Sequence, residues 1–438
     1  MAPESGSLPQ SANIGEHMML LARRLYPICR SITGDGLRAT LRILGEDLPL
    51  KIEEVPSGTK VLDWEVPDEW NIRSAAITRE TGERVVDFAD HNLHILQYSA
   101  PVDRVVPMEE LRRHLHTLPD QPDLIPYRTA YYAKTWGFCL RDRTLETMRD
   151  PAYRVRIDST LAPGHLSYGE LFVPGGLEDE VLFSIHCCHP SLANDNLSGM
   201  VIARALAERL LAQRPRLSYR FLFIPGTIGS ITWLARNRER VQRIKHGLVL
   251  SCLGDVGPLT YKRSRRDDAT IDQAVAHVLQ HQGNGSKTVP FIPYGYDERQ
   301  YGSPGFDLPV GCLMRSPNGT FPEYHTSADN LDFIQPDALA GSLDALTKIV
   351  EVLEHDGRYR NTSPYGEPQL GRRGLYRPIG GQQDASAYDQ MVLLWVLNLS
   401  DGQHSLLDIA RRAERPFGMV RAAAADLQRV GLLEPVTP

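Results

Sequence analysis

The stretch Val181–Met200, VLFSIHCCHPSLANDNLSGM, joins an apolar run to a group of potential metal ligands and then to an apolar helix pattern. Its first five residues, VLFSI, have the length and β-branched content of a buried strand. The sequence DNLSG follows after a proline-containing turn. Open α/β sheets carry their functional side chains in such a position, just after the carboxyl end of a strand. His189 and Asp195 are therefore the first candidate functional residues.

Strand and helix patterns alternate through this part of the chain. Two amphipathic helices are expected first, at residues 16–26 and 37–44. The strands and helices expected after them cover residues 169–175, 181–185, 198–211, 219–224, 229–241, 247–253, 269–282, 289–293, 310–314 and 337–353. Alternation of this kind predicts an α/β fold, a mixed sheet flanked by helices.

Three other segments differ in their patterns and divide the chain into domains. Residues 1–14 lack the basic start and apolar run of a secretory signal, and we expect a disordered lead-in. Between residues 56 and 162, short alternating runs separated by Gly, Pro and Asp predict an inserted β-rich domain. Residues 365–438 have the size of a separate winged-helix-like domain. The catalytic domain then consists of residues 15–55 and 163–358.

The C-terminal segment carries three helical runs, expected at residues 385–398, 405–413 and 419–430. Domains of this kind often contact DNA, which requires a concentrated basic patch. Residues 371–438 contain eight Arg against seven Asp and Glu, so the sequence does not predict such a patch. We expect a protein-contact or interdomain role, and we do not expect nucleic-acid binding.

The composition, with 42% hydrophobic and 23% charged residues among 438, is that of a globular protein. The net charge of −6 argues against a nucleic-acid-binding surface and against a polybasic membrane anchor. No apolar run approaches the ~20 residues that a membrane helix needs. Six cysteines without a CxxC pair predict neither a disulfide scaffold nor a zinc knuckle, so we expect a cytoplasmic protein.

His189 and Asp195 offer an imidazole and a carboxylate, which are standard zinc ligands. A catalytic zinc ion needs about three protein ligands and one position for water. The alternative is a buried histidine with a satisfied partner and an aspartate that caps a helix. His186, three positions before His189, could be a ligand by spacing, but we expect it to face the packed side of its strand, and we expect Cys187 and Cys188 to pack there as well.

A second group of candidate residues lies in PEYHTSADN, residues 322–330. On an extended segment, Glu323 and His325 point to the same side about 7 Å apart. This spacing suits a metal ligand beside a carboxylate that takes a proton from a metal-bound water. The alternative is a surface loop whose polar residues cap the helix that follows.

NDNLSG, the downstream YHTSAD and the strand–helix order between them resemble the zinc aminopeptidase superfamily, which includes glutaminyl cyclases and the transferrin-receptor ectodomain. Longer motifs resemble a bacterial aminopeptidase-like subfamily with an inserted β domain and a C-terminal winged helix. These motifs are PICRSITGDG, VPSGTKVLDWEVPDEWNI, WGFCL, CHPSLANDNLSG, PGTIGSITWL and DERQYGSPGFDLPVG. Many members of that subfamily lie in polysaccharide or natural-product gene clusters. The resemblance covers nearly the whole chain beyond the N-terminal tail.

The resemblance implies specific metal ligands. His189 matches the first metal histidine of the superfamily, Asp195 its bridging aspartate and His325 its last metal histidine. Asp255, in GLVLSCLGDVG, is a candidate for an additional ligand.

This chain also departs from the superfamily pattern. Classical members carry a Glu-Glu pair, a base and a second metal ligand, where this chain has Gly226 and Thr227. Ser191 stands where they have a further aspartate. We therefore expect one zinc ion per chain, held by His189, Asp195 and His325.

Without the glutamate pair, the general base must come from another part of the chain. Glu323 is the first candidate, and Asp297 or Glu298 in YDERQY is the second. Arg299 and Arg315 can pair with a substrate carboxylate, although structural ion pairs are an equally good interpretation.

Two tyrosines are candidate substrate-binding residues. Tyr131 lies in the aromatic stretch Tyr127–Phe138, which either lines a substrate cleft or packs the core of the insertion. Tyr301 ends the motif YDERQY, whose two carboxylates, Asp297 and Glu298, match the region where classical members carry substrate-pocket residues.

The function expected from these patterns is zinc-dependent hydrolysis of a peptide or amide bond, aminopeptidase-like, in a small peptide or biosynthetic intermediate. One alternative is a zinc amidohydrolase that deacylates a natural-product or sugar intermediate. The others are a binding protein with a decayed catalytic centre and a winged-helix regulator. The sequence predicts no membrane partner and leaves open whether the chain forms a homo-oligomer.

Overall fold

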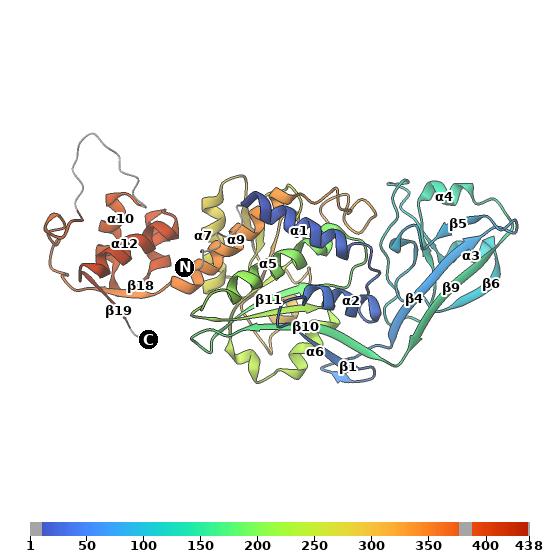
Figure 1. Cartoon of the computed structure of the whole chain (residues 1–438), viewed down its shortest axis with the longest axis horizontal. Coiled ribbons are helices and arrows are strands. Elements are labelled where there is room, and N and C mark those ends of the chain that lie inside the picture. The colour runs from blue at the N-terminus through green and yellow to red at the C-terminus, as the bar shows by residue number, and fades with distance from the viewer. Residues whose placement is uncertain (1–10, 376–387, 437–438) are drawn as a thin grey trace, which may run out of the picture. The chain divides into compact units, whose positions relative to one another are not determined.

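The computed structural model describes residues 11–375 and 388–436 (Figure 1). The chain forms two compact units. The first runs to residue 269 and also includes residues 289–343, and the second contains residues 270–288 and the chain from residue 344. Residues 1–10 of the expected lead-in lie outside the described residues. Helix α1 (Ser11–Leu25) begins at residue 11, so the lead-in does not extend to residue 14 as expected.

An eight-stranded mixed sheet forms the centre of the first unit, with the order β1-β10-β12-β11-β13-β16-β14-β15. Its strands are β1 (Lys51–Pro56), β10 (His165–Val173), β11 (Glu180–His186), β12 (Ser218–Ile224), β13 (Ile244–Leu250), β14 (Thr260–Lys262), β15 (Lys287–Val289) and β16 (Val310–Met314). The four central strands β12, β11, β13 and β16 are parallel, whereas β1, β10 and β14 pair in antiparallel fashion. The expected mixed α/β sheet is confirmed.

Helices cover both faces of this sheet. Helices α5 (Gly199–Leu211), α1 and α2 (Asp35–Leu44) lie on one face, where α5 packs against the other two. Helix α6 (Ile228–Arg236) lies on the opposite face (Figure 1). Every residue of β11 and β12 is buried, as expected for parallel strands with both faces covered. Arg220 and Glu180 are the charged residues in these strands, and they bond to each other at 2.7 and 2.9 Å.

The β-rich insertion lies between β1 and β10 and contains the four-stranded antiparallel sheet β5-β4-β9-β6. Its strands are β2 (Lys60–Val61), β3 (Trp64–Glu65), β4 (Glu69–Thr78), β5 (Arg84–Asp87), β6 (Val102–Pro107), β7 (Leu115–His116), β8 (Phe138–Cys139) and β9 (Ala152–Ala162). Short helices connect them: η1 (Asn92–His94), α3 (Met108–Leu111), η2 (Arg112–His114) and α4 (Asp142–Thr147). Burial alternates along β9, so one face of this sheet is packed.

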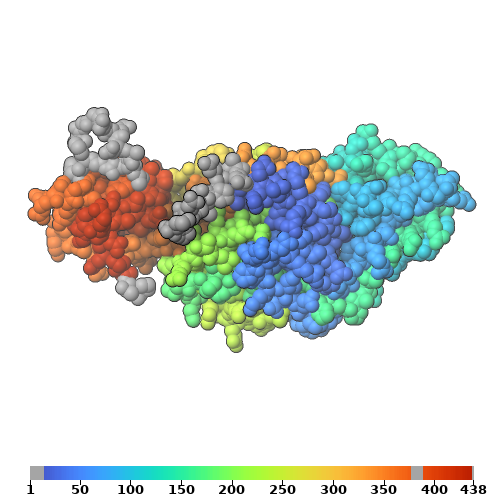
Figure 2. All heavy atoms as spheres, in the orientation of Figure 1, coloured from blue at the N-terminus to red at the C-terminus, as the bar shows by residue number. Residues whose placement is uncertain are grey.

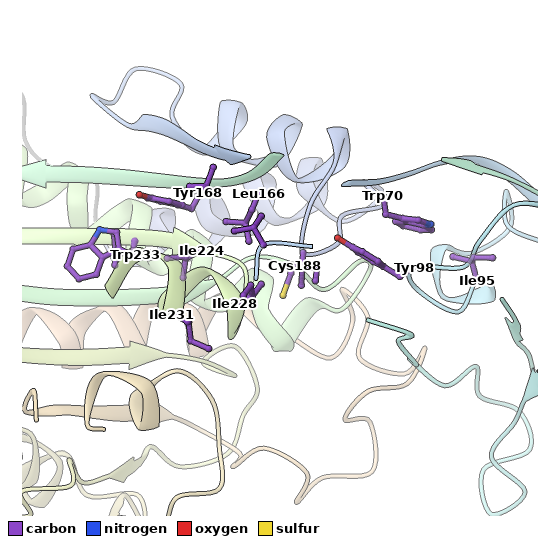
Figure 3. Packing of buried hydrophobic residues seen from close by; sticks show 14 of the residues in the cluster. Trp70, Ile95, Tyr98, Leu166, Tyr168, Cys188, Ile224, Ile228, Ile231 and Trp233 are labelled. Atoms are coloured by element: carbon purple, nitrogen blue, oxygen red, sulfur yellow. The ribbon is translucent and has the colours of Figure 1, made fainter. Parts of the chain in front are cut away.

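The insertion shares a hydrophobic core with the central sheet. One cluster of buried residues runs from Trp70 and Tyr98 of the insertion to Leu166, Ile224 and Trp233 around the central sheet (Figure 3). The rings of Trp70 and Tyr98 stack with their centroids 5.8 Å apart. The surface of the insertion is continuous with that of the N-terminal helices (Figure 2). This packing holds the loops of the insertion in place beside the sheet.

The second unit contains a winged-helix domain. The unit contains α7 (Thr270–Gln282). The winged-helix domain itself contains β17 (Arg358–Asn361), η5 (Gly371–Arg373), α10 (Gln390–Leu399), β18 (Asp401–Ser405), α11 (Leu406–Ala413), α12 (Phe417–Arg429) and β19 (Leu433–Pro435). Strand order is β18-β17-β19, and α10, α11 and α12 contact one another. The helix expected at residues 385–398 begins later, at Gln390, and residues 385–387 lie outside the described residues. Helix α9 (Pro336–His355) begins in the first unit and ends in the second.

Within the described ranges, no helix combines the length and the apolar character that crossing a membrane would require.

Candidate metal site and aromatic cavity

The site lies at the carboxyl end of β11, where the order of the parallel strands reverses. Strand β12 follows β11 on one side, and β13 then pairs with β11 on the other side. Open α/β sheets form a crevice at such a reversal. His186 is the last residue of β11, and Asp195 lies in the following turn η3 (Ala193–Ser198), at a kink where the backbone of Asp195 and Asn196 is not helical.

Three histidines surround the carboxylate of Asp195. His186 Nε2 lies 2.7 Å from Asp195 Oδ1, and His325 Nε2 lies 3.0 Å from Asp195 Oδ2. The ring of His189 has its centroid 4.9 Å from that of His186 and 5.3 Å from that of His325. Ligand atoms of His186, His189 and Asp195 all lie within 4.8 Å of one another. The predicted residues His189, Asp195 and His325 therefore come together in space.

His186 is buried, as expected, but its ring also contacts the candidate metal ligand Asp195. Its ring contacts Asp195 through Nε2, while its Nδ1 lies 3.3 Å from the side-chain nitrogen Nδ2 of Asn196. Because β11 is buried on both faces, the alternation of side chains could not tell which face His186 occupies. Cys187 and Cys188 are also buried, and burial raises the pKa of both thiols.

The carboxylate of Asp329 and the side-chain amide of Asn196 hold the loop that carries Asp195 in position. The carboxylate of Asp329 accepts hydrogen bonds from the backbone N–H of Asn194 at 2.6 Å and of Asp195 at 3.0 Å. The side chain of Asn196 donates to the carbonyl of Leu250 at the end of β13. The loop after β11 is thus tied both to the segment of His325 and to the neighbouring strand.

Burial and charge set the protonation of this cluster. Burial lowers the pKa of His189 well below its ordinary value, so the imidazole is neutral at neutral pH. Burial alone would raise the pKa of Asp195, but the histidines around it hold that pKa well below its usual range. A carboxylate beside the neutral imidazole of His189 is the form in which these two side chains bind a metal ion.

A cavity of about 260 Å³ opens beside the cluster. Its lining residues are Ile32, Trp64, Tyr127, Thr129, Tyr131, Tyr132, His189, Gly226, Thr227, Ile228, Tyr296 and His325. The insertion supplies most of the aromatic rings, and Tyr131 is one of the residues proposed from the sequence. The ring of Tyr127 lies 4.9 Å from that of His189 and 5.1 Å from that of His325. Backbone contact also joins them, since Tyr127 N donates to His325 O at 2.8 Å.

Glu323 and His325 do not lie on an extended segment. Thr326 N donates to Glu323 O at 3.1 Å, and His325 has a positive φ of 55°, so the chain turns here. The expected parallel direction of the two side chains is therefore wrong. Glu323 is half-buried and lies on the turn that presents His325, and it is not among the residues that line the cavity described above.

The other two candidate bases are buried and engaged elsewhere. Asp297 is fully buried, and its Oδ1 accepts a hydrogen bond from Ser230 at 2.9 Å. Glu298 is fully buried as well and forms an ion pair with Lys262. Neither residue lines the cavity.

Asp255 and Arg315 have structural partners. The carboxylate of Asp255 accepts from Asn194 at 2.9 Å and from the hydroxyl of Ser316 at 2.9 Å. Arg315 donates to the hydroxyl of Ser342 and to two backbone carbonyls. The guanidinium of Arg315 thus has the structural role that was the alternative to substrate binding.

Tyr301 and Arg299 also lie outside the cavity lining. Tyr301 is fully buried, and its hydroxyl lies 2.9 Å from the hydroxyl of Ser184 in β11. Arg299 is half-buried and opposes the rise in the pKa of Asp297. Tyr296 was not among the candidates, although it lines the cavity and its ring centroid lies 4.0 Å from that of His186. No local sequence signal marks Tyr296, because the room for its ring comes from the missing side chain of Gly226, 70 residues earlier.

This combination of sheet, helices and strand-end site defines the class of the molecule, which has the fold of the zinc aminopeptidases. The structure of BSAP, a zinc aminopeptidase from Bacillus subtilis, aligns with a TM-score of 0.58 and 13% identity. The alignment covers 80% of this chain and 96% of the other, and it shows the shared fold.

The chain belongs to the family described as "Domain of unknown function (DUF4910)", which matches residues 19–356. A winged helix-turn-helix family matches residues 357–435. A Clostridium acetobutylicum protein named for polysaccharide biosynthesis and an aminopeptidase-like domain is 47% identical over 427 residues, 98% of either chain. A crystal structure named as a peptidase from the same organism has a TM-score of 0.93 and 46% identity, covering 97% of both chains.

Proposed function

We propose that this protein is a zinc-dependent hydrolase of an amide bond in a small peptide or biosynthetic intermediate. The observation that carries the proposal is the group of imidazoles around Asp195 beside an aromatic cavity. His189, Asp195 and His325 would hold one zinc ion. His186 would orient the carboxylate of Asp195 through the 2.7 Å contact to its other oxygen.

The zinc ion would polarise the scissile carbonyl and lower the pKa of a bound water. The residues of the chain provide the remaining functions. The aromatic walls of the cavity position the substrate. Glu323 is our candidate for the base, because it lies on the turn that carries His325 and because the other two candidates are buried with their own partners.

Removal of an acyl group from a sugar or natural-product intermediate is the second candidate function. The residues that line the cavity include no Asp or Glu, the groups that would bind the free ammonium of a peptide substrate. The name of the Clostridium acetobutylicum relative, which refers to polysaccharide biosynthesis, agrees with this candidate. Turnover of an N-acetylated amino sugar without turnover of an amino-acid amide would favour it.

Regulation through DNA binding is a less favoured function. Helix α12 carries two arginines, Arg421 and Arg429. Arg421 pairs with Glu351 at 3.0 Å and Arg429 pairs with Asp426 at 2.8 Å. Because both charges already have acidic partners, this helix offers little attraction for phosphate.

Elemental analysis tests the metal site directly. We expect about one zinc ion per chain, and loss of the ion in Asp195→Ala and in His325→Ala. The Glu323→Gln variant should retain the ion and lose most turnover, since it removes the base and leaves the ligands intact. Two ions per chain, or full retention of zinc in both ligand variants, would overturn the mononuclear site.

A further inference from the structure

Gly226 and Tyr296 fit into each other beside the metal cluster. Gly226 follows the end of β12, at the same edge of the sheet as His186. A Cβ atom at position 226 would overlap the ring of Tyr296 and would lie 2.5 Å from its hydroxyl oxygen. The phenol of Tyr296 therefore occupies the space in which any side chain at position 226 would lie.

This arrangement places the phenol of Tyr296 at the end of the cavity where His189 and His325 lie. Both Gly226 and Tyr296 line the cavity together with His189 and His325. The ring centroid of Tyr296 lies 4.0 Å from that of His186 and 6.1 Å from that of His189. A group at this distance from the cluster can reach an oxygen atom of a substrate that is held there.

The hydroxyl of Tyr296 is also suited to donate a hydrogen bond to a ligand. Its contact in the structure is with the sulfur of Cys188 at 3.6 Å, and sulfur is a weak acceptor. By contrast, the hydroxyls of Tyr127 and Tyr131, which line the same cavity, lie 3.1 Å from each other. A phenol keeps its proton at neutral pH, so Tyr296 acts as a donor there.

We propose that Tyr296 is a catalytic hydrogen-bond donor, which stabilises the negative charge that develops on the substrate carbonyl oxygen. This inference rests on the proposed amide hydrolysis. In that step, water forms a bond to the carbonyl carbon and gives its proton to the base, while the carbonyl electron pair moves onto oxygen. Tyr296 donates to that oxygen and keeps its proton. The C–N bond then breaks, and the nitrogen takes up the proton. Preorganised donors of this kind contribute strongly to rate.

Tyr296→Phe removes the hydroxyl and keeps the ring that fills the space beside Gly226. We expect kcat to fall roughly 100-fold or more with little change in KM and an unchanged zinc content. Tyr168→Phe is the matched control, because Tyr168 is buried outside the cavity and its hydroxyl contacts Arg236. A kcat within threefold of the natural protein in Tyr296→Phe would overturn the proposal.

Gly226→Ala tests the same arrangement without changing the phenol. The added methyl group must displace the ring of Tyr296, so kcat should fall as in Tyr296→Phe. The kcat of the double variant should be no lower than that of the less active single variant, because both substitutions act on the same hydroxyl. Independent, multiplying losses would contradict the coupling.

Binding of acetohydroxamate to the zinc-loaded protein separates this inference from the proposed function. We expect the affinity to fall about tenfold in Tyr296→Phe and to stay unchanged in Tyr168→Phe. If the natural protein hydrolyses no amide yet shows this difference, amide hydrolysis fails and the donor role of Tyr296 stands. Equal affinities in all three proteins would overturn the donor role, and a protein that binds no zinc would overturn both.

Discussion

At the scale of single residues, Asp297 is a buried carboxyl whose charged form is destabilised more by burial than it is stabilised by Ser230 and Arg299. It is fully buried, one oxygen accepts from Ser230, and the other has no hydrogen-bond partner among the described residues. Burial raises the pKa of Asp297 to about 7, and the neighbouring Glu298 adds to the rise. The protein therefore folds more favourably when this group is neutral.

The pKa of Asp297 leads to a prediction about stability and pH. Its value of about 7 in the folded protein exceeds the ~3.9 of an ordinary aspartate, so the neutral form stabilises the fold below pH 4. This stability is lost as the pH rises through 7. Asp297→Asn places a neutral group of the same shape at this position. The difference in free energy of unfolding between this variant and the natural protein should therefore increase by about 2–3 kcal/mol in favour of the variant from pH 5 to pH 8.

Urea unfolding at both pH values measures this difference. The exposed Asp120 provides the control, and Asp120→Asn should follow the natural protein at each pH. Parallel curves for Asp297→Asn and the natural protein would show that Asp297 is ionised in the fold.

The residues of the metal cluster were predictable to the extent that they lie in local sequence patterns. His189 and Asp195 follow a strand, so residue type and position pointed to them, whereas His325 was proposed as a ligand from the resemblance of its YHTSAD motif. His186 and Tyr296 were missed for different reasons. The face occupied by His186 depends on the packing of a strand that is buried on both sides. The position of Tyr296 depends on its fit to Gly226, which is 70 residues earlier and has no local sequence signature.

At the scale of elements, helix α11 begins with a complete capping box. The hydroxyl of Ser405 accepts from the backbone N–H of Asp408 at 3.2 Å, and the carboxylate of Asp408 accepts from Ser405 N at 2.9 Å. Four backbone N–H groups at a helix start lack helical partners, and this box satisfies them in part. The strand β18 ends at the same serine, so the cap also fixes the passage from strand to helix.

Ser405→Ala should destabilise α11 by about 1 kcal/mol, since the hydroxyl acceptor is lost. Hydrogen exchange at the first turn of α11 should then become about fivefold faster. Ser405→Gly is the matched variant, because glycine at this position costs only a few tenths of a kcal/mol. Equal exchange in the serine and alanine proteins would show that the cap does not limit the opening of the helix.

The order and type of the main elements followed from apolar periodicity, but their ends depended on local hydrogen bonds. The helix expected at residues 229–241 ends at Arg236, and a separate 3-10 turn η4 (Arg240–Arg243) follows it. Asn237 closes the helix, with its side chain donating to the carbonyl of Trp233. Competition of this kind between an asparagine side chain and the backbone is not visible in apolar periodicity.

At the scale of the whole molecule, the boundary between structural units differs from the boundary between sequence families. The two families meet at residues 356 and 357. The second structural unit, however, also includes residues 270–288 and the end of α9 from residue 344. Inside this unit, Arg411 donates to Gln273 of α7 at 2.6 Å, and Asp356 accepts from the backbone of Leu407 at 2.9 Å. The winged helix therefore packs with segments whose sequence belongs to the other family.

A chain truncated after residue 356 should consequently be less stable than the full chain. It keeps the whole region that matches the DUF4910 family but loses the neighbours of α7 and of the last turns of α9. We expect its first thermal unfolding transition to occur at least ~5 °C lower, the effect of a loss of about 2 kcal/mol in a unit of this size. Scanning calorimetry of both chains measures the shift. Arg421→Ala in the full chain is the control, because it removes only the half-exposed ion pair with Glu351, worth about 1 kcal/mol or less. If the truncated chain and the full chain unfold at the same temperature, α7 and α9 are held by the first unit alone, and the boundary between the families is also the boundary of folding.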